Sequence, residues 1–459
     1  LNRFVHRTLI DRLDRLTKRN VSNGAVVVIE NVTGNVLALV GSHNYFEEES
    51  GQVNGAWAQR SAGSTFKPFT YLLALEAGMT PATVIADVPT DFATSTGVFS
   101  PQNFNRQFYG PMRLRLALAN SLNVSAVKVL EAAGGATVLQ ERLRECGLTT
   151  LEAKAEHYGL GLTIGNAEAR LMELTNAYAT LARMGVHRPV RLLASDAETV
   201  EQVFDARHAW LVADMLSDNA ARAPAFGWES ALAFDFPVAC KTGTSSDFRD
   251  NWAMGYTPEF TVGVWVGNFD GAPMQNVSGV TGAAPVMHTV MEHLHKRFGT
   301  SEFEQPNGLT RAQVNRISGR RAGEGVAEWF VAKQLPPKES RDDFDAAGRV
   351  KLGVDYAEWF ASADNTIRSR TVLDVSKMAE LRVLSPMAGT VYYLDPDLPP
   401  SSRQVRLRVN GVAARWSSDT LECIAIDGDV FVQLQPGRHQ LTVEVGGHRL
   451  ETWIRVEGL

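Results

Sequence analysis

The first part of the chain alternates between helical and extended patterns of apolar residues. Phe4, Val5, Leu9, Leu13 and Leu16 recur at intervals of about one helical turn, which predicts an amphipathic helix. The apolar runs AVVVIE and VLALVGS flank the turn-forming segment NVTGN, and this arrangement predicts a β-hairpin. A polar, glycine-rich loop follows, and the sequence becomes helical again after Gly63.

Residues from about 112 to 222 contain mostly helical patterns, such as the apolar stripe in NAEARLMELTNAYATLARMG. β-rich runs then return in FPVACKTGTS, NWAMGY and FTVGVWVGN, and MHTVMEHLHKRF is again helical. The order is therefore helix, two strands, helices, three strands and helix. It predicts an α/β fold in which helices cover a sheet.

The pattern changes twice further along, which predicts three segments. Residues 1–300 form the α/β domain described above. Residues 301–378 carry weaker periodicity, with Pro336, Pro337 and a charged stretch, and we expect a connecting region. Residues 379–459 contain short alternating runs separated by turn residues, which predicts a small all-β sandwich.

Composition narrows the range of partners. The 45 basic and 51 acidic residues give a formal net charge of −6, so we expect no nucleic acid as a partner. The chain contains no apolar run long enough to span a membrane and begins without an apolar signal-peptide core or a Met. We therefore expect a piece of a longer protein that lacks its membrane anchor.

The three cysteines, Cys146, Cys240 and Cys423, are far apart in the sequence. Their spacing matches no metal-binding pattern, and an odd number does not suit a disulfide framework. We expect three buried thiols, and we expect neither a metal site nor a cofactor.

The first candidate for chemistry is Ser64-Thr65-Phe66-Lys67, where a loop becomes a helix. Residues three apart share a helical face, so the Ser64 hydroxyl and the Lys67 amine can meet. A neutral amine can take the proton of a serine hydroxyl and make it a nucleophile. Ser125 and Lys128 repeat the same spacing, but we expect them inside a helix without a catalytic role.

The second candidate is Lys241-Thr242-Gly243, followed by Thr244, at the end of an apolar strand. Lys241 would attract an anionic substrate, and the two threonine hydroxyls could bind a carboxylate. Gly243 has no side chain, so an extended peptide could lie against the strand. The backbone N–H groups of Ser64 and Thr244 could form an oxyanion hole.

A third motif of the form Ser-x-Asn is expected between these two, and the chain offers two candidates. Ser121-Leu122-Asn123 interrupts two helical patterns, and its short loop could face a cleft, although Asn123 could equally be a helix N-cap. Ser217-Asp218-Asn219 lies at a helix end, where Asn219 is more simply a C-cap. We prefer the first, but spacing alone does not decide between them.

The ordered motifs STFK, SLN and KTGTS resemble those of the penicillin-recognising serine enzymes. Their surroundings, GQVNGAWAQRSAGSTFKPFTYLLALEAG, ANSLNVSAVKVLEAAG and CKTGTSSDFRDNWAMGYTPEFTVGVWVGN, resemble the transpeptidase domain of class A penicillin-binding proteins. The 1C type is the most similar, because it also ends in a small β domain. The resemblance favours Ser121 and Asn123 for the third motif. It implies a five-stranded antiparallel sheet with helices on both faces, together with a helical lobe.

The resemblance also implies a reaction and a role for each residue. A serine D,D-transpeptidase would use Ser64 to attack a D-Ala–D-Ala carbonyl and form an acyl-enzyme. Lys67 would act as the base, Ser121 would relay a proton to the leaving amine, and Asn123 would orient Lys67 and the substrate. Lys241 would hold the terminal carboxylate.

In this interpretation Thr242 and Thr244 bind the substrate carboxylate beside Lys241, and Gly243 leaves room for the peptide. The substrates are peptidoglycan stem peptides, a D-Ala–D-Ala donor and an amine acceptor, and β-lactams inhibit by acylating Ser64. Members of this type occur with a large α2-macroglobulin-like envelope protein, so such a partner is expected. The location implied is the periplasm, with the full-length protein anchored to the inner membrane.

Three alternatives remain. A D,D-carboxypeptidase would use the same acyl-enzyme with water as the acceptor. A low-turnover penicillin-binding sensor or scaffold would act through its β domain. A β-lactamase needs a deacylating carboxylate, and Glu173 lies in a helical stripe at the wrong spacing for one.

Overall fold

The computed structural model describes residues 1–48, 50–94, 97–193, 195–196, 199–374, 382–394, 403–409, 414–426, 428–445 and 447–458. The chain divides into two compact units. The first comprises Leu1–Ile85 and Arg113–Lys338, and the second comprises Ala86–Met112 and Glu339–Leu459. The three-segment division remains a prediction, and its boundary between residues 378 and 379 lies outside the described residues.

The helices of the first unit include the segments in which the sequence shows apolar stripes. They are α1 Asn2–Asp14, α2 Lys67–Glu76, α3 Leu114–Ala119, α4 Asn123–Ala132, α5 Gly135–Glu145, α6 Ala155–Tyr158, α7 Leu171–Ala182, α8 Ala206–Ser217, α9 Asn219–Phe226 and α10 Ala284–Phe298. A short 3₁₀ helix, η2 (Gly63–Phe66), directly precedes α2. In the described part of the chain, no helix combines the length and apolar character that a membrane span needs.

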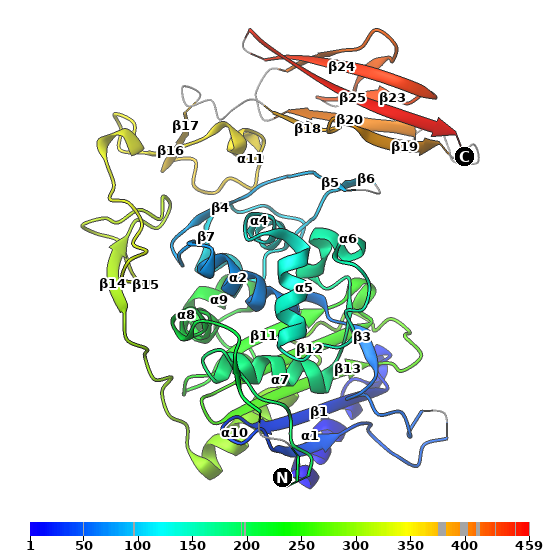
Figure 1. The fold of residues 1–459 in the computed structure, drawn as a ribbon, viewed down its shortest axis with the longest axis vertical. Helices are drawn as coiled ribbons and strands as arrows, with labels where there is room; N and C mark the ends of the chain where they lie inside the picture. The colour runs from blue at the N-terminus through cyan, green and yellow to red at the C-terminus, as the bar shows by residue number, and fades with distance from the viewer. Residues whose placement is uncertain are drawn as a thin grey trace. The chain divides into compact units, whose positions relative to one another are not determined.

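A five-stranded sheet lies at the centre of the first unit (Figure 1). Its strands, in spatial order, are β11 Ala239–Thr244, β12 Asp250–Tyr256, β13 Phe260–Gly267, β1 Asn23–Glu30 and β2 Val36–Val40. Every neighbouring pair is antiparallel. The predicted hairpin (β1 and β2), the three later strands and the antiparallel sheet are therefore confirmed. β11 is an edge strand of this sheet.

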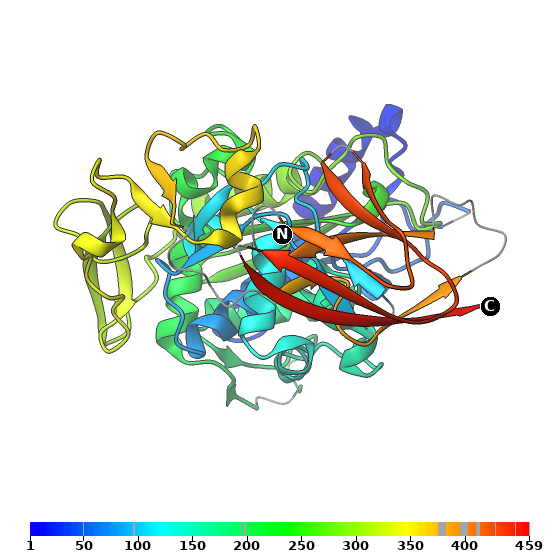
Figure 2. The same ribbon diagram turned by 90° about the horizontal axis from the view of Figure 1, so that it is seen from above.

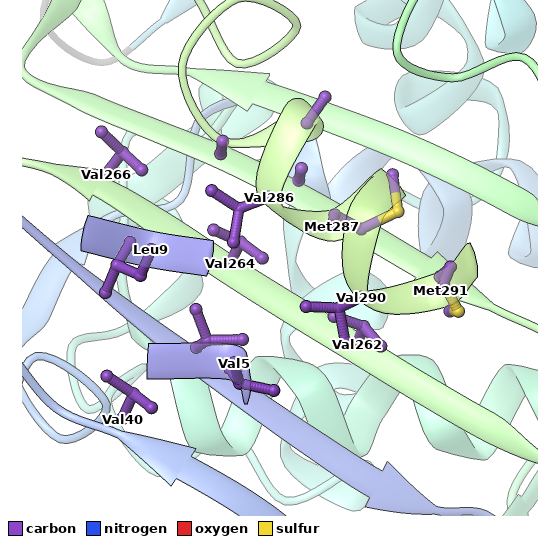
Figure 3. Close-up of a cluster of buried hydrophobic side chains, with 14 of the residues drawn as sticks. Val5, Leu9, Val40, Val262, Val264, Val266, Val286, Met287, Val290 and Met291 are labelled. Atoms are coloured by element: carbon purple, nitrogen blue, oxygen red, sulfur yellow. The ribbon is translucent and has the colours of Figure 1, made fainter. Parts of the chain in front are cut away.

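Helices cover both faces of the sheet because the side chains of β13 alternate. Val262, Val264 and Val266 point toward α1 and α10, where they join a cluster of buried apolar side chains (Figure 3). Gly263 faces the other way, where an added Cβ would lie 2.1 Å from Thr175 Oγ1 of α7. The sheet is thus packed between α1 and α10 on one side and α7 on the other.

Short strands complete the first unit. β3 (Gln59–Ser61) pairs with β8 (Glu168–Arg170), and β9 (Val186–His187) pairs with β10 (Glu201–Gln202). An antiparallel hairpin of β14 (Leu309–Val314) and β15 (Val326–Val331) follows α10 in the sequence. β4 (Val84–Asp87) and β7 (Gly110–Arg113) pair where the chain passes between the two units.

The second unit contains two four-stranded sheets near the C-terminus, which Figures 1 and 2 show at the orange and red end of the colour scale. One has the order β18-β20-β23-β22 and the other β19-β25-β24-β21. Both sheets contribute side chains to one apolar core, including Leu407, Val432, Leu441 and Ile454. The predicted all-β C-terminal region is confirmed. The strands are β18 Val383–Ser385, β19 Thr390–Leu394, β20 Gln404–Val409, β21 Arg415–Ser417, β22 Cys423–Ile426, β23 Asp429–Gln433, β24 Gly437–Val445 and β25 His448–Gly458.

The remaining elements of the second unit are small. β5 (Phe92–Thr94) pairs with β6 (Gly97–Phe99), and β16 (Val350–Leu352) pairs in parallel with β17 (Thr371–Leu373). The short helix α11 spans Ala357–Ala361.

All three cysteines have free thiols. Cys146 and Cys240 are buried as expected, whereas Cys423 is only half-buried. The prediction that Cys423 is buried is therefore wrong. Cys423 lies on β22, an edge strand of its sheet, and is partly exposed there.

Candidate active site

Ser64 lies in η2, which packs directly against β11. Gly63 has a φ of 53°, a left-handed conformation that glycine adopts without strain. A Cβ at Gly63 would lie 2.9 Å from the carbonyl oxygen of Thr244, so the close contact also requires glycine. Ser64 itself is half-buried. The tight turn at Gly63 therefore places the candidate nucleophile beside the end of β11.

Side chains from the sheet and from α7 fix the backbone around Ser64. The Tyr178 hydroxyl donates to the carbonyl oxygen of Thr65 at 2.7 Å, and burial raises the pKa of Tyr178, so the hydroxyl stays protonated. The Trp252 indole N–H donates to the carbonyl oxygen of Ser61 at 2.7 Å. These bonds hold the turn from two sides.

Lys67 is the first residue of α2 and is completely buried. Its Nζ donates to Asn123 Oδ1 at 2.7 Å and to the carbonyl oxygen of Ser121 at 2.5 Å, and it lies 3.3 Å from Ser121 Oγ. The structure therefore brings the first and third motifs together. The acceptors around Nζ can stabilise an ammonium group that forms when the amine takes a proton.

Ser121 lies in the short loop between α3 and α4 and has a φ of 56°. The backbone N–H groups of Ser121 and Leu122 donate to the carbonyl oxygens of Leu118 and Ala117, so α3 holds this loop directly. A residue with a Cβ adopts such a conformation only where the surroundings impose it. The constraint presents the Ser121 hydroxyl to both lysines.

Lys241 approaches the same hydroxyl from β11. Its Nζ donates to Ser121 Oγ at 2.8 Å and to the carbonyl oxygen of Thr242 at 2.7 Å, and its side chain is buried. Burial, and then the nearby charge of Arg222, lowers the pKa of Lys241 to about 7. One hydroxyl is thus hydrogen-bonded between two amines, an arrangement suited to proton relay.

The end of β11 has the features expected of a peptide-binding edge. A Cβ on Gly243 would lie 2.8 Å from Thr65 Cγ2, so this glycine is needed where β11 passes η2. Thr244 Oγ1 accepts a hydrogen bond from the N–H of Gly279 at 2.9 Å, and Thr242 is buried. Because β11 is an edge strand, its main chain can pair with an extended ligand.

Asp250 and Asn251 brace the chain after β11. The N–H of Asp250 donates to Ser245 Oγ at 2.8 Å, and the Trp265 indole N–H donates to Asp250 Oδ1 at 2.9 Å. Asn251 Nδ2 donates to the carbonyl oxygen of Val277 at 2.9 Å. The buried Trp252 and Trp265 belong to the core, as their strand positions predict.

Two interpretations of single residues are corrected. Asn123 is not the N-cap of α4, because Leu122 occupies that position. Asn219 is not a C-cap, because Asp218 ends α8 and accepts from the N–H of Ala221 as the N-cap of α9. Ser125 lies within α4 as expected and is buried.

Arg222 is a residue of the site that the sequence analysis missed. It lies on α9 and is 3% exposed, and its Nη2 donates to the carbonyl oxygen of Leu216 at 2.5 Å. Its charge acts on Lys241. No sequence motif marks this arginine, because only tertiary packing brings its charge near Lys241.

Comparison with known proteins finds a matching family. The family described as "Penicillin binding protein transpeptidase domain" matches residues 24–292, a range that includes every candidate site residue. Among curated relatives, penicillin-binding protein 1C of Escherichia coli is 33% identical over 326 residues, covering 69% of this chain and 41% of that protein. Penicillin-binding protein 1A of Aquifex aeolicus is 31% identical over 340 residues, covering 70% and 45%. The chain thus spans less than half the length of these relatives.

Solved structures show the same fold. Penicillin-binding protein 1A from Haemophilus influenzae superposes with a TM-score of 0.61 at 22% identity, covering 69% of this chain and 54% of that one. PonA1 from Mycobacterium tuberculosis in complex with penicillin V gives a TM-score of 0.56 at 23% identity, covering 71% and 89%.

Proposed function

Because this chain belongs to the transpeptidase family of the penicillin-binding proteins, we propose that it is a serine D,D-transpeptidase that cross-links peptidoglycan stem peptides. The observation that carries the proposal is the pair of hydrogen-bond distances at Ser121 Oγ, 2.8 Å from Lys241 Nζ and 3.3 Å from Lys67 Nζ. Three motifs distant in the sequence meet at this hydroxyl.

In the first half-reaction, Ser64 Oγ attacks the carbonyl carbon of the penultimate D-Ala while Lys67 takes the hydroxyl proton. The N–H groups of Ser64 and Thr244 stabilise the oxyanion. Collapse of the tetrahedral intermediate breaks the peptide bond. Ser121 gives its hydroxyl proton to the departing amine of the terminal D-Ala and takes from Lys67 the proton that Lys67 removed from Ser64. The products are free D-Ala and an ester on Ser64.

In the second half-reaction, an amine of another stem peptide attacks the ester carbonyl. The amine loses a proton through the same groups, the ester bond breaks, and Ser64 regains its hydroxyl proton. Asn123 keeps Lys67 in place through both halves, since its Oδ1 accepts from Nζ at 2.7 Å.

The terminal carboxylate of the donor is bound by the Lys241 ammonium and by the hydroxyls of Thr242 and Thr244. A β-lactam carries a similarly placed carboxylate and a reactive amide, so it acylates Ser64 and inhibits. This proposed function implies that the protein acts in the cell envelope. The envelope protein partner expected from the resemblance stays a prediction.

The test is product analysis on a stem pentapeptide with and without an acceptor amine. A transpeptidase releases D-Ala and forms the cross-linked peptide when the acceptor is present, and Ser64→Ala forms neither product. Release of D-Ala with a hydrolysed tetrapeptide as the only other product would instead identify a D,D-carboxypeptidase. Penicillin binding without turnover of either kind would identify a sensor or scaffold.

A further inference from the structure

The hairpin β14–β15 lies beyond residues 24–292, which match the transpeptidase family, and within the segment expected to be a connecting region. It is nevertheless docked on the helices of the first unit. The Trp329 ring packs edge-on against Trp210 of α8, with ring centroids 5.5 Å apart. This docking brings Glu328 of β15 into the interior, where its side chain is fully buried.

Glu328 is the counter-charge of two buried arginines. Arg115 Nε donates to Glu328 Oε2 at 2.8 Å and Arg115 Nη2 donates to Oε1 at 2.5 Å. These two hydrogen bonds form a bidentate salt bridge. Arg113 Nη1 lies 3.3 Å from Glu328 Oε2. Burial lowers the pKa of Arg113 and the charge of Glu328 opposes that shift. Burial lowers the pKa of Arg115 as well. The hydrogen bonds and negative charges of Glu328 and Asp214 outweigh this effect, so the pKa of Arg115 is raised overall.

Arg115 connects this carboxylate to three helices. It is a residue of α3, it forms an ion pair with Asp214 of α8, and its Nη1 lies 3.2 Å from Asp218 Oδ2. Asp218 is the N-cap of α9, accepting from the N–H of Ala221 at 2.9 Å. The guanidinium therefore fixes α3 relative to both α8 and the start of α9.

These helices hold the Ser121 loop. α3 ends at Ala119, and Asn120 follows it immediately before Ser121. Asn120 Nδ2 donates to the carbonyl oxygen of Ala221 at 2.8 Å, and Asn120 Oδ1 accepts from the N–H of Ala225 at 3.0 Å. The loop is thus attached to α3 by the backbone and to α9 by Asn120. Any shift of α3 against α9 moves Ser121 relative to Lys67 and Lys241.

We propose that Glu328 is a positioning residue of the active site, acting through Arg115 and the packing of α3 and α9 to hold Ser121 between the two lysines. The hairpin β14–β15 is then a functional part of the catalytic unit. This inference rests on the proposed function, since its readout is acylation of Ser64.

The experiment measures the rate constant for acylation of the whole chain by a fluorescent penicillin. Glu328→Gln keeps the size of the side chain but removes the charge, and we expect acylation about 10- to 100-fold slower, the loss typical of a small misplacement of reacting groups. Glu324→Gln is the matched control, because Glu324 lies exposed in the same hairpin's turn, and it should acylate at the parent rate. Leu9→Ala, in the core on the other face of the sheet, controls for general loss of stability and should lower the melting temperature while acylation stays at the parent rate.

A double-mutant cycle with Ser121→Ala separates positioning from a general effect. If Glu328 acts through Ser121, Glu328→Gln slows acylation less than about threefold once Ser121 is alanine. An equal slowing in both backgrounds, or a parent rate in Glu328→Gln, overturns the inference while leaving the proposed function intact. Failure of the unsubstituted chain to acylate overturns the proposed function itself, and the inference with it.

Discussion

At the scale of single residues, the carboxylate-binding role that we propose for Lys241 requires a positive charge, yet the burial of its side chain disfavours that charge. Burial and then Arg222 lower its pKa to about 7, from an ordinary value of 10.5. The free enzyme therefore loses the Lys241 charge as the pH rises through neutrality. Binding of an anionic ligand opposes this loss, because an opposite charge favours the ammonium form.

The second-order rate constant for acylation by penicillin should accordingly fall above about pH 7, approaching a tenfold loss per pH unit well above the pKa of Lys241. Measuring this rate constant at pH values from 6 to 9 tests the prediction. Arg222→Met removes one cause of the lowered pKa, so the fall should begin at a higher pH. Arg3→Met, an exposed arginine at the N-terminus, should leave the profile unchanged. A flat profile, or an Arg222→Met profile that coincides with the parent's, would contradict this interpretation.

The residues of the three motifs could be predicted from the sequence because each motif is local and its context resembles a known family. Arg222 and Arg115 could not be predicted, since their roles depend on which helices pack together. The choice between Ser121 and Ser217 needed the resemblance as well, because spacing alone suits both. The structure shows directly that Ser121 contacts both lysines.

At the scale of elements, the contact between η2 and β11 brings Ser64 to the end of the edge strand β11, where we propose that the peptide binds. Both Gly63 and Gly243 lie in this contact, and neither has room for a side chain. The sequence predicted the start of a helix at Ser64 and a strand that ends near Gly243. It did not indicate that the two glycines face one interface.

Gly63→Ala should cost about 1–2 kcal/mol in the free energy of unfolding from the left-handed backbone alone. The added Cβ should also push η2 away from Thr244, so we expect acylation by penicillin to slow at least tenfold. Gly78→Ala is the control. Gly78 also has a positive φ, 101°, but an added Cβ there meets nothing within 4 Å. Chemical denaturation measures the free energy of unfolding of both variants, and acylation kinetics measure their reaction with penicillin. Equal acylation rates in Gly63→Ala and Gly78→Ala would show that the η2–β11 contact does not limit the reaction.

At the scale of the whole molecule, the second unit is built from two distant parts of the sequence. Trp359 of α11 is buried, its indole N–H donates to the carbonyl oxygen of Phe108 at 3.0 Å, and its ring lies where a Cβ of Gly110 would be. The N–H of Phe108 donates to Asp364 at 2.9 Å. The segment around Phe108 and Gly110 thus packs against a segment more than two hundred positions later in the chain.

Trp359→Ala should therefore destabilise the second unit by about 3–5 kcal/mol and loosen the segment around Phe108 and Gly110. Limited trypsin digestion should then cut after Arg106, which is exposed, faster than in the parent chain. Trp453→Ala, at a position 38% exposed in the same unit, should leave the cleavage rate nearly unchanged. Cleavage after Arg106 at the parent rate in Trp359→Ala would refute this account of the unit.

The α/β class, the order of elements and the all-β C-terminal region could all be predicted from periodicity, because each element carries its own local pattern. The discontinuous second unit could not, since no local pattern tells which distant segments pack together. The weak periodicity after residue 300 likewise did not indicate that Glu328 of the β14–β15 hairpin is buried and forms an ion pair with Arg115 of α3.

The most direct test of the central claim is the mass of the intact chain after incubation with a β-lactam, followed by peptide mapping of the adduct. The account predicts one covalent adduct per chain on the peptide containing Ser64, and no adduct on Ser64→Ala. An adduct on any other side chain, or none on the unsubstituted protein, would contradict it.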